Sequence, residues 1–410
     1  MKFFFPDAQD MIYPEYDFLH DEYPAHRVRQ RDDRYAHEVL EPVPYDGMLI
    51  SKAIIDGVGN AVGKYSQAQR DRLYRRGGKS FFRLPDGLEL LGDCGAFSYV
   101  KEDVPPVTVT EVLDFYEACG CDAGISIDHL ILDFESGAPL FDADPDWSRR
   151  RSISLDLAAS FKEEAERRNS FVEPVGAAQG WSPGSYAESV RELQDMGYRR
   201  VALGGMVPLK TNQILETLDA VALVLKPDTN LHLLGVARPE VMDDFAERGV
   251  SSFDSTSPFR QAFMDDRKNY HTATGAYVAI RVPQVDGNAR LKRRILAGEV
   301  DQAEAIRLER ECLRRLRAFD QGQMTSSDVL ASLVEYETLL EPDKKSYVQG
   351  YEQMLGDAPW KRCTCTLCQT HGIEIAIFRG TERNKRRGFH NIAVLSEKIP
   401  GRRPTKKGSR

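Results

Sequence analysis

The stretch LELLGDCGAFSY, residues 88–99, determines how the rest of the chain is interpreted. Its apolar part, residues 88–91, predicts a short buried strand. The small residues Gly92 to Ala96 follow it and predict a sharp turn. We therefore expect Asp93 at the end of a strand with little side-chain bulk around it, where a flat molecule can approach its carboxylate.

Patterns of strand and helix alternate along residues 48–264. This alternation predicts βα units and a parallel sheet. The number of units exceeds a minimal doubly wound fold and favours a (β/α)8 TIM barrel in the α/β class. Neither a GxGxxG nor a GxxxxGK[ST] motif follows the first predicted strand, Met48 to Ile55, which weighs against a Rossmann or P-loop nucleotide site.

The remaining segments differ in composition and periodicity, and the chain is predicted to have five parts. Residues 1–47 show little periodicity and predict an irregular N-terminal arm; residues 48–264 are the main part of the barrel with the active site; residues 265–355 are a basic helical insertion with the end of the barrel; residues 356–395 are a zinc-binding subdomain; residues 396–410 are a basic disordered tail.

Composition limits the class of protein. The 410 residues are 41% apolar and 29% charged, as expected of a soluble globular protein. No apolar run is long enough for a membrane span, and the apolar part of the N-terminus is too short for a signal peptide, so we expect a cytoplasmic protein with no membrane partner. The net charge of -8 argues against a uniformly basic surface for nucleic acid, although a local basic patch is compatible with it.

Polar or small residues recur where the predicted strands end. The set is Asp93, Asp128, Gln179, Gly204 with Gly205, Gly235 and Asp254. In a βα barrel these positions hold the catalytic groups. A carboxylate and an amide can read the edge of a purine-like base, while a second carboxylate acts as a nucleophile and a third carries a proton. The alternative is that each aspartate caps the following helix, which we favour for a single position but not for the whole set.

Three cysteines, Cys363, Cys365 and Cys368, have the spacing of metal ligands. Three thiolates this close can hold one face of a tetrahedral zinc, and either His371 or His390 can complete it. Such a site is closed, which predicts a structural rather than a catalytic Zn2+. Cys94, Cys119 and Cys121 are better interpreted as small core residues.

Two basic stretches are candidates for phosphate contacts. The predicted helix 290–319 is rich in arginine with interleaved acidic residues, and Arg383 to Arg387 form a shorter run. Phosphate binding through such residues is strongly salt-dependent. For the helix, an ordinary solvated charged face is an equally good interpretation.

Taken together, these motifs resemble those of the tRNA-guanine transglycosylase family, which carries a three-cysteine, one-histidine zinc subdomain on a (β/α)8 barrel. GDCGAF is similar to its DSGGFQ, and FDSTSPFR is similar to its FDCVxPTR. The resemblance implies that Asp254 is the nucleophile, that Asp93 transfers the proton and that Phe97 stacks on the base. CTCTLC with GFHN is similar to its CxCxxC with a distal histidine, which favours His390 over His371.

The same resemblance implies which residues bind the base. ISIDHL, AAQG, LGGM and LLGVA are similar to the corresponding family segments. They assign base binding to Asp128, Gln179, Gly204, Gly205, Met206 and Gly235.

The segment after Arg260 lacks the arginine-rich pattern of the tRNA enzymes, and no PUA-like C-terminal domain is visible in the sequence. In these respects the chain is more similar to the DNA-modifying branch of the family than to the tRNA enzymes. This resemblance implies replacement of guanine in DNA by a free 7-deazaguanine base (preQ0), with possible help from proteins that open the duplex. A tRNA-guanine transglycosylase is the alternative. A non-catalytic RNA-binding subunit is disfavoured because Asp93 and Asp254 are both present, and a zinc hydrolase because the metal would have no open position.

Overall fold

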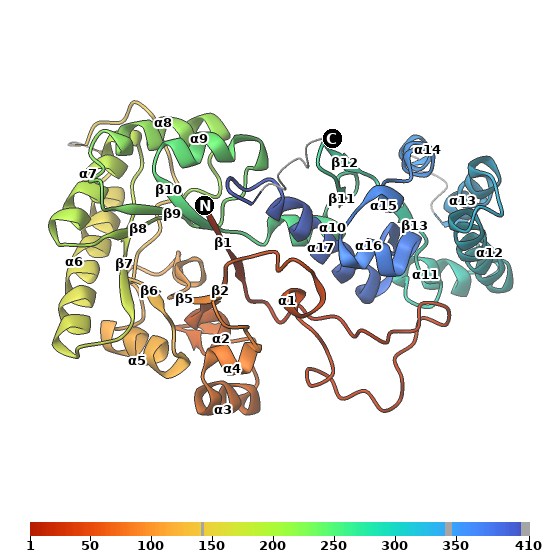
Figure 1. Ribbon diagram of the computed structural model, residues 1–410, viewed down its shortest axis with the longest axis horizontal. Coiled ribbons are helices and arrows are strands. Elements are labelled where there is room, and N and C mark those ends of the chain that lie inside the picture. The colour runs from red at the N-terminus through yellow and green to blue at the C-terminus, as the bar shows by residue number, and fades with distance from the viewer. Residues whose placement is uncertain (141–142, 341–346, 403–410) are drawn as a thin grey trace, which may run out of the picture. The chain divides into compact units, whose positions relative to one another are not determined.

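The computed structural model describes residues 1–140, 143–340 and 347–402, which form two compact units (Figure 1). The barrel unit contains Met1–Gln9, Tyr45–Thr256 and the described residues from Lys398 onward. The helical unit contains Asp10–Pro44 and Ser257–Glu397. Each unit is therefore built from separate stretches of the chain.

The barrel unit is a closed barrel of eight parallel strands, which confirms the predicted (β/α)8 fold. Around the barrel the order is β1 (Lys2–Pro6), β10 (Val250–Asp254), β9 (Asn230–Leu233), β8 (Arg200–Leu203), β7 (Glu173–Ala178), β6 (Ala123–Ile125), β5 (Glu89–Asp93) and β2 (Gly47–Ser51). Because all strands run the same way, their carboxyl ends share one face of the barrel.

The first strand, β1, corrects the predicted irregular arm. Residues 2–6, KFFFP, pair with β10 on one side and with β2 on the other, and so close the barrel. Phe3, Phe4 and Phe5 are all buried. A strand of a parallel barrel is covered on both faces, so its sequence shows no alternation of apolar and polar residues, and a run this short gives little periodic signal.

Helices cover the outside of the barrel, as Figure 1 shows for the segment that follows β5. They are α5 (Val109–Cys119), α6 (Pro145–Arg167), α7 (Pro183–Asp195), α8 (Thr211–Ala222) and α9 (Met242–Glu247). Between β2 and β5 lie α2 (Lys52–Ile55), β3 (Gly57–Val58), β4 (Ala61–Val62), α3 (Gln67–Arg76) and α4 (Gly78–Phe82). The strand predicted over 48–55 is thus β2 followed at once by α2.

The barrel interior is filled mainly by small and aliphatic side chains. The cluster comprises Phe4, Leu49, Leu91, Ala123, Ile125, Val175, Ala177 and Ala202. Outside it, Tyr116 of α5 packs between Gly92 and Gly124, where an added Cβ on either glycine would lie 2.3 Å from the ring. Tyr116 also donates to the carbonyl of Ile125 at 2.8 Å, so this packing fixes the ends of β5 and β6 beside the predicted site.

The helical unit contains nine α-helices among the described residues. Besides the single-turn helix α1 (Ala36–Val39), they are α10 (Ser257–Met264), α11 (Ala289–Leu296), α12 (Gln302–Asp320), α13 (Ser326–Leu340), α14 (Val348–Asp357), α15 (Pro359–Arg362), α16 (Thr366–His371) and α17 (Gly380–Ser396). The helix predicted over 290–319 is divided because α11 ends before Gly298, which has a φ of +72°, and Asp301 caps α12.

Strands of the helical unit form only two-stranded pairs among the described residues. They are β11 (Tyr270–His271) with β12 (Ala276–Tyr277), and β13 (Ile280–Arg281) with β14 (Ile377–Phe378). The barrel therefore closes without them, and residues 265–355 do not contain its end. Of the predicted disordered tail, residues 403–410 lie outside the described residues. Within the described chain, no helix is both long and apolar enough to cross a membrane.

Candidate active site and metal cluster

The polar residues singled out by the sequence meet at the carboxyl end of the barrel. Asp93 is the last residue of β5 and Asp254 the last residue of β10. Gln179 directly follows β7, and Gly204 directly follows β8. Asp128 and Gly235 come shortly after β6 and β9. The parallel barrel thus brings together groups that are far apart in the sequence.

Asp128 and Gln179 form the centre of this group. The amide Nε2 of Gln179 donates to Oδ2 of Asp128 at 2.5 Å, and the backbone N–H of Ile131 donates to Oε1 of Gln179 at 3.2 Å. Both side chains are almost completely buried. An added Cβ on Gly204 would lie 2.0 Å from Nε2 of Gln179, so glycine at 204 is what leaves room for the pair.

Cys94 and Tyr99, both from the stretch 88–99, also form hydrogen bonds with Asp128. The thiol of Cys94 donates to Oδ1 of Asp128 at 3.6 Å, and the Tyr99 hydroxyl donates to the Asp128 carbonyl at 3.1 Å. Burial raises the pKa of the Asp128 carboxyl to about 6, although the bonds from Gln179 and Cys94 oppose this rise. Burial also raises the pKa of the Cys94 thiol well above its usual value, which agrees with a lining rather than nucleophilic role.

Asp93 has an electrostatic environment suited to proton transfer. Burial, followed by the nearby charge of Asp128, raises its pKa to about 7. The charge of Asp254 adds to the rise, while a hydrogen bond from the backbone of Gly95 opposes it. A carboxyl group with a pKa near neutrality can give and take a proton under ordinary conditions.

Asp254 is held by one neighbour on β9 and one in the turn that follows it. Its Oδ1 accepts from the backbone N–H of Gly235 at 2.9 Å and lies 3.2 Å from Nε2 of His232. Gly235 has a φ of +73°, a conformation that favours glycine. The sequence analysis missed His232, since a histidine within the apolar run LHLL is indistinguishable there from an ordinary core residue.

The remaining predicted base-binding residues line the same barrel end. Gly205 has a φ of +72°, and a Cβ there would lie 2.6 Å from the carbonyl oxygen of Ile131. Met206 is fully buried. Phe97, by contrast, is 56% exposed, which leaves a ring face available for stacking on a planar molecule.

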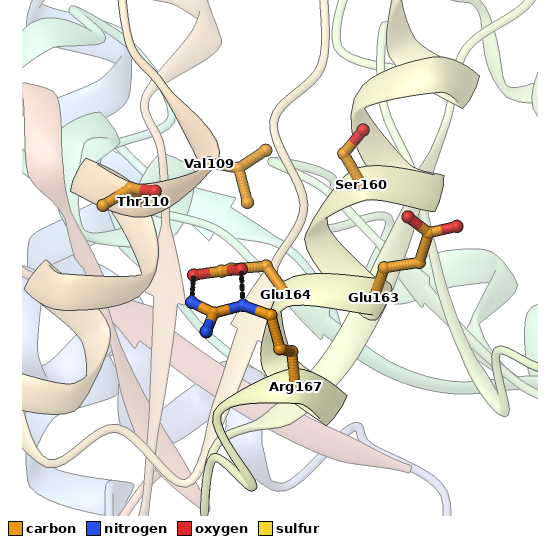
Figure 2. Close-up of a pocket in the computed structure, with 6 residues that line it drawn as sticks. All are labelled: Val109, Thr110, Ser160, Glu163, Glu164 and Arg167. Atoms are coloured by element: carbon orange, nitrogen blue, oxygen red, sulfur yellow. Dashed lines mark hydrogen bonds and ion pairs between the residues drawn. The ribbon is translucent and has the colours of Figure 1, made fainter.

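A surface cavity of about 320 Å³ lies elsewhere, between α5 and α6 (Figure 2). Its lining residues are Val109, Thr110, Ser160, Glu163, Glu164 and Arg167. Figure 2 shows Arg167 turned toward Glu164, and the two form an ion pair with a distance of 2.7 Å. None of the strand-end residues lines this cavity, so it is separate from the candidate active site.

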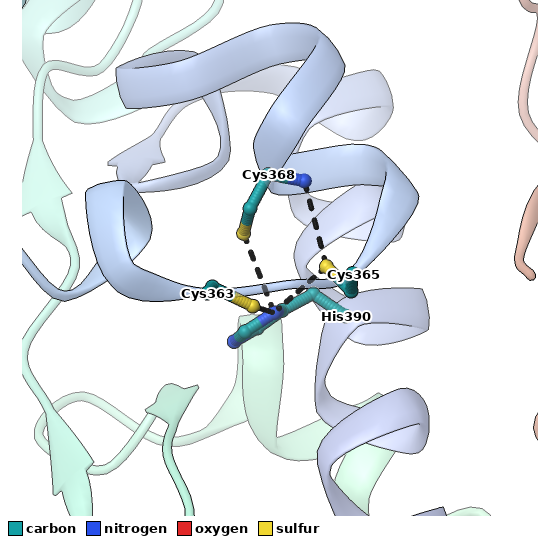
Figure 3. A group of neighbouring side chains, drawn as sticks. All are labelled: Cys363, Cys365, Cys368 and His390. Atoms are coloured by element: carbon teal, nitrogen blue, oxygen red, sulfur yellow. Dashed lines mark hydrogen bonds between the residues drawn. The ribbon is translucent and has the colours of Figure 1, made fainter. Parts of the chain in front are cut away.

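The helical unit brings the three predicted cysteines together with His390 (Figure 3). Nδ1 of His390 lies 3.5, 3.4 and 3.4 Å from the sulfur atoms of Cys363, Cys365 and Cys368. A tetrahedral zinc with ordinary Zn–S and Zn–N bonds separates sulfur and nitrogen by about 3.5 Å. The donor set therefore has the composition and spacing that a structural Zn2+ requires.

Neighbouring groups orient the histidine of this cluster. Nε2 of His390 lies 2.9 Å from the carbonyl oxygen of His271, so Nε2–H donates there and leaves Nδ1 free to bind a metal. The Tyr270 ring stacks on His390 with the ring centroids 4.2 Å apart. His371, the other candidate ligand, lies outside the cluster and contacts the ring of Phe18.

The predicted phosphate contacts of Arg383 to Arg387 are wrong for its three arginines, which are buried. Arg383 pairs with Asp21 and Glu374, and Arg386 pairs with Glu382. Arg387 donates to backbone carbonyl groups, including that of Ala262 at 2.6 Å. These guanidinium groups hold the helical unit together and are not available to a nucleic acid.

The arginine-rich helices differ from one another in available charge. On α12, Arg307 pairs with Glu304, and Arg314 pairs with Glu311. On α11, Lys292 and Arg293 are exposed and have no acidic partner among the described residues. Two adjacent exposed cations thus lie on α11, and Arg310 is a further exposed arginine on α12.

Comparison with known proteins agrees with this geometry. A family model described as queuine tRNA-ribosyltransferase matches residues 96–294. A DNA-guanine transglycosylase from Salmonella montevideo is 48% identical over 404 residues, which cover 97% of this chain and 96% of the relative. The chain belongs to the tRNA-guanine transglycosylase family. Members of this family are transglycosylases of the pentosyltransferase class, and this chain is such an enzyme.

Other members of the tRNA-guanine transglycosylase family match shorter parts of the chain. A queuine tRNA-ribosyltransferase from Gluconacetobacter diazotrophicus is 33% identical over 116 residues, 27% of this chain and 30% of the relative. A tRNA-guanine(15) transglycosylase from Thermococcus kodakarensis is 28% identical over 188 residues, 45% of this chain and 30% of the relative.

Proposed function

We propose that this transglycosylase replaces guanine in DNA with a 7-deazaguanine base, preQ0, through a covalent intermediate on Asp254. The observation that carries the choice of DNA is the full-length similarity to a protein named as a DNA-guanine transglycosylase. Three relatives named for tRNA match 27%, 48% and 45% of the chain. The barrel end supports the chemistry because it gathers Asp93, Asp128 and Asp254 with Gln179.

The reaction proceeds in two displacements. In the first, a carboxylate oxygen of Asp254 attacks C1′ of the target nucleotide and the C1′–N9 bond breaks. The electron pair of that bond leaves with guanine, which takes a proton from Asp93. In the second, Asp93 removes a proton from the incoming base, whose ring nitrogen attacks C1′ and returns Asp254 to its carboxylate form. Two inversions give net retention.

The base is read by Asp128, Gln179 and Gly205. Asp128 accepts from the N–H groups of the base edge, while Gln179 and the backbone around Gly205 donate to its carbonyl. Phe97 stacks on the face of the base, and Gly204, Gly235 and Met206 shape the space around it. The target nucleotide must leave the helical stack to reach these groups, so duplex DNA needs base flipping or a partner protein that opens it.

Exposed charge on α11 supports a place for the DNA backbone. Lys292 and Arg293 each present a cation without an acidic partner among the described residues. Phosphate contacts of this kind position a nucleic acid without reading its sequence. The zinc held by Cys363, Cys365, Cys368 and His390 would supply structural stability alone, because its four ligands leave no open position.

The deciding experiment measures incorporation of radiolabelled guanine into three substrates: duplex DNA, single-stranded DNA and tRNA. Incorporation into DNA but not tRNA is expected. Incorporation into tRNA alone would establish the alternative, a tRNA-guanine transglycosylase, which the tRNA relatives and the matching family model support. Activity on single-stranded but not duplex DNA would show that a partner must open the helix. Replacing guanine with preQ0 as the incoming base then tests the choice of base.

The nucleophile is tested with Asp254→Asn, which is expected to abolish exchange and to form no covalent protein–DNA adduct. The matched control is Asp219→Asn, because Asp219 is an exposed carboxylate on α8 that pairs with Arg248. Substantial exchange by folded Asp254→Asn protein would disprove the covalent role of Asp254.

A further inference from the structure

Three buried side chains on adjacent strands form a continuous hydrogen-bonded chain at the barrel end. Nδ1 of His232 lies 2.9 Å from Oγ of Ser252, and Nε2 of His232 lies 3.2 Å from Oδ1 of Asp254. His232 and Ser252 are paired neighbours in the register of β9 and β10. Their exposed fractions are 2% and 3%, so water does not compete for these contacts.

The chemistry of the three groups determines the direction of these bonds. An ionised Asp254 only accepts hydrogen bonds, so Nε2 of His232 must carry a hydrogen and donate it. In the neutral imidazole Nδ1 then accepts, and the Ser252 hydroxyl donates to it. The Phe4 ring meets His232 edge to face, with the ring centroids 5.8 Å apart, and restricts rotation of the imidazole.

This arrangement makes the two oxygens of Asp254 unequal. Oδ1 receives the backbone N–H of Gly235 at 2.9 Å as well as the imidazole. Within the described part of the chain, no hydrogen bond reaches Oδ2. A carboxylate oxygen with two donors is less nucleophilic than one with none, so Oδ2 is the oxygen that is free to react.

We propose that His232 is a positioning residue for the nucleophile: it holds Oδ1 of Asp254 and presents Oδ2 to C1′, while Ser252 fixes the imidazole in the donating tautomer. The inference rests on the proposed role of Asp254 as nucleophile. In the first displacement the C1′–N9 bond breaks and the C1′–Oδ2 bond forms, with the electron pair leaving on guanine, which Asp93 protonates. Oδ1 then becomes the ester carbonyl oxygen and keeps both donors.

The second displacement uses the same contacts. When the incoming base attacks C1′, the C1′–Oδ2 bond breaks and its electron pair returns to the carboxylate. The Nε2–H of His232 and the N–H of Gly235 stabilise the returning negative charge. Because the free base is read by other residues, loss of His232 lowers kcat for base exchange and leaves KM for the base nearly unchanged.

The test compares variants that remove or restore the donor. His232→Phe keeps a ring but has no N–H, whereas His232→Gln places an amide N–H near the position of Nε2. Ser252→Ala removes the hydroxyl that fixes the tautomer, and Ser252→Thr retains one. Each holoenzyme is assayed for kcat, for KM of guanine and for the single-turnover rate of covalent DNA adduct formation after denaturing quench.

We expect His232→Phe to lower kcat and the adduct rate at least tenfold with KM within twofold of the unsubstituted enzyme. His232→Gln should have a kcat and an adduct rate at least threefold higher than those of His232→Phe. Ser252→Ala should be slower than Ser252→Thr. A His232→Phe enzyme with more than half of the original kcat, or a His232→Gln enzyme no faster than His232→Phe, overturns the inference.

Two further comparisons keep the result interpretable. If His232→Phe does not fold, the comparison of Ser252→Ala with Ser252→Thr tests the inference instead. Equal rates for these two variants overturn it. Asp254→Asn separates the two levels of the argument. An active Asp254→Asn enzyme refutes the nucleophile itself, whereas an inactive one beside a fully active His232→Phe enzyme refutes only the role of His232.

Discussion

Gln179 donates its amide N–H to the carboxylate of Asp128 at 2.5 Å, so the two side chains proposed to read the base already hold each other before a base arrives. The backbone of Ile131 fixes the amide from its other end, at 3.2 Å from Oε1. This pre-arranged pair has a defined donor and acceptor pattern, which is the property that selects one base edge over another.

Gln179→Glu is expected to disrupt base binding in a pH-dependent way. It places a second carboxylate beside Asp128, where the two groups can share one proton but resist ionising together. We expect KM for guanine to rise about tenfold or more at pH 8 and by less at pH 6, which corresponds to about 1.4 kcal/mol per factor of ten. Gln67→Glu, an exposed position on α3, is the matched control. An unchanged KM at both pH values would contradict the assignment.

Asp93→Asn is expected to stabilise the fold at high pH. Burial and the charge of Asp128 raise the pKa of Asp93 to about 7 from its ordinary value of 3.8, so its ionised form is disfavoured in the folded state. The resulting cost is complete above pH 7, shrinks as the pH falls and is absent below the unfolded pKa. Urea unfolding should show a gain on the order of 3 kcal/mol at pH 8 and less than half of that at pH 5.

The control for this measurement is Asp219→Asn, which should change the free energy of unfolding little at either pH because its carboxylate is exposed. A destabilised Asp93→Asn protein at pH 8 would show that the Asp93 carboxylate is stabilised by its surroundings. The Asp93→Asn enzyme should have no exchange activity at either pH, since asparagine cannot transfer a proton to the departing base.

Removal of metal should unfold the part of the chain around the cysteine cluster rather than only stop turnover. The four ligand atoms lie within 4.8 Å of one another, and without a metal that geometry brings thiolates into close contact. The four-ligand site is expected to bind about one zinc per chain. Cys368→Ser should lose this zinc and have a lower Tm. Cys312→Ser, a buried cysteine outside the cluster, should retain the metal. Full activity and an unchanged Tm after chelation would contradict a structural role.

Neutralising the exposed charge on α11 should weaken DNA binding through the phosphate backbone. The double variant Lys292→Gln with Arg293→Gln removes two cations, so the slope of log affinity against log salt should become shallower by about 1.8. The matched pair Arg307→Gln with Arg314→Gln removes two arginines that are already neutralised by Glu304 and Glu311. Equal slopes for the two double variants in a salt titration would refute α11 as a contact surface.

Much of the barrel was predictable because its signals are local. Asp93, Gln179 and Asp254 each follow a short apolar run, and the fold itself then brings their strand ends together. The first strand was not predictable in the same way, since Phe3, Phe4 and Phe5 are buried on every side and show no alternation.

Residues whose roles depend on distant partners escaped the sequence analysis. The charge of Arg383 suggested an exposed phosphate ligand, yet its acidic partner Asp21 lies far away in the chain and only the fold brings it near. His232 carries no motif of its own, and its relevance depends on Ser252 and Asp254 in the neighbouring strand. Gly298 and Asp301, by contrast, were local signals that separate α11 from α12.

The interleaving of the two units has a consequence for how the protein is made. Asp10–Pro44 belongs to the helical unit although it lies between the barrel strands β1 and β2. Its Asp21 accepts hydrogen bonds from Arg379 and from Arg383 of α17, which leave the ribosome only near the end of synthesis. The nascent segment must therefore wait for nearly the whole chain before its buried charges are neutralised. A single stop codon cannot yield either unit intact, and isolating one requires two cuts and a new join.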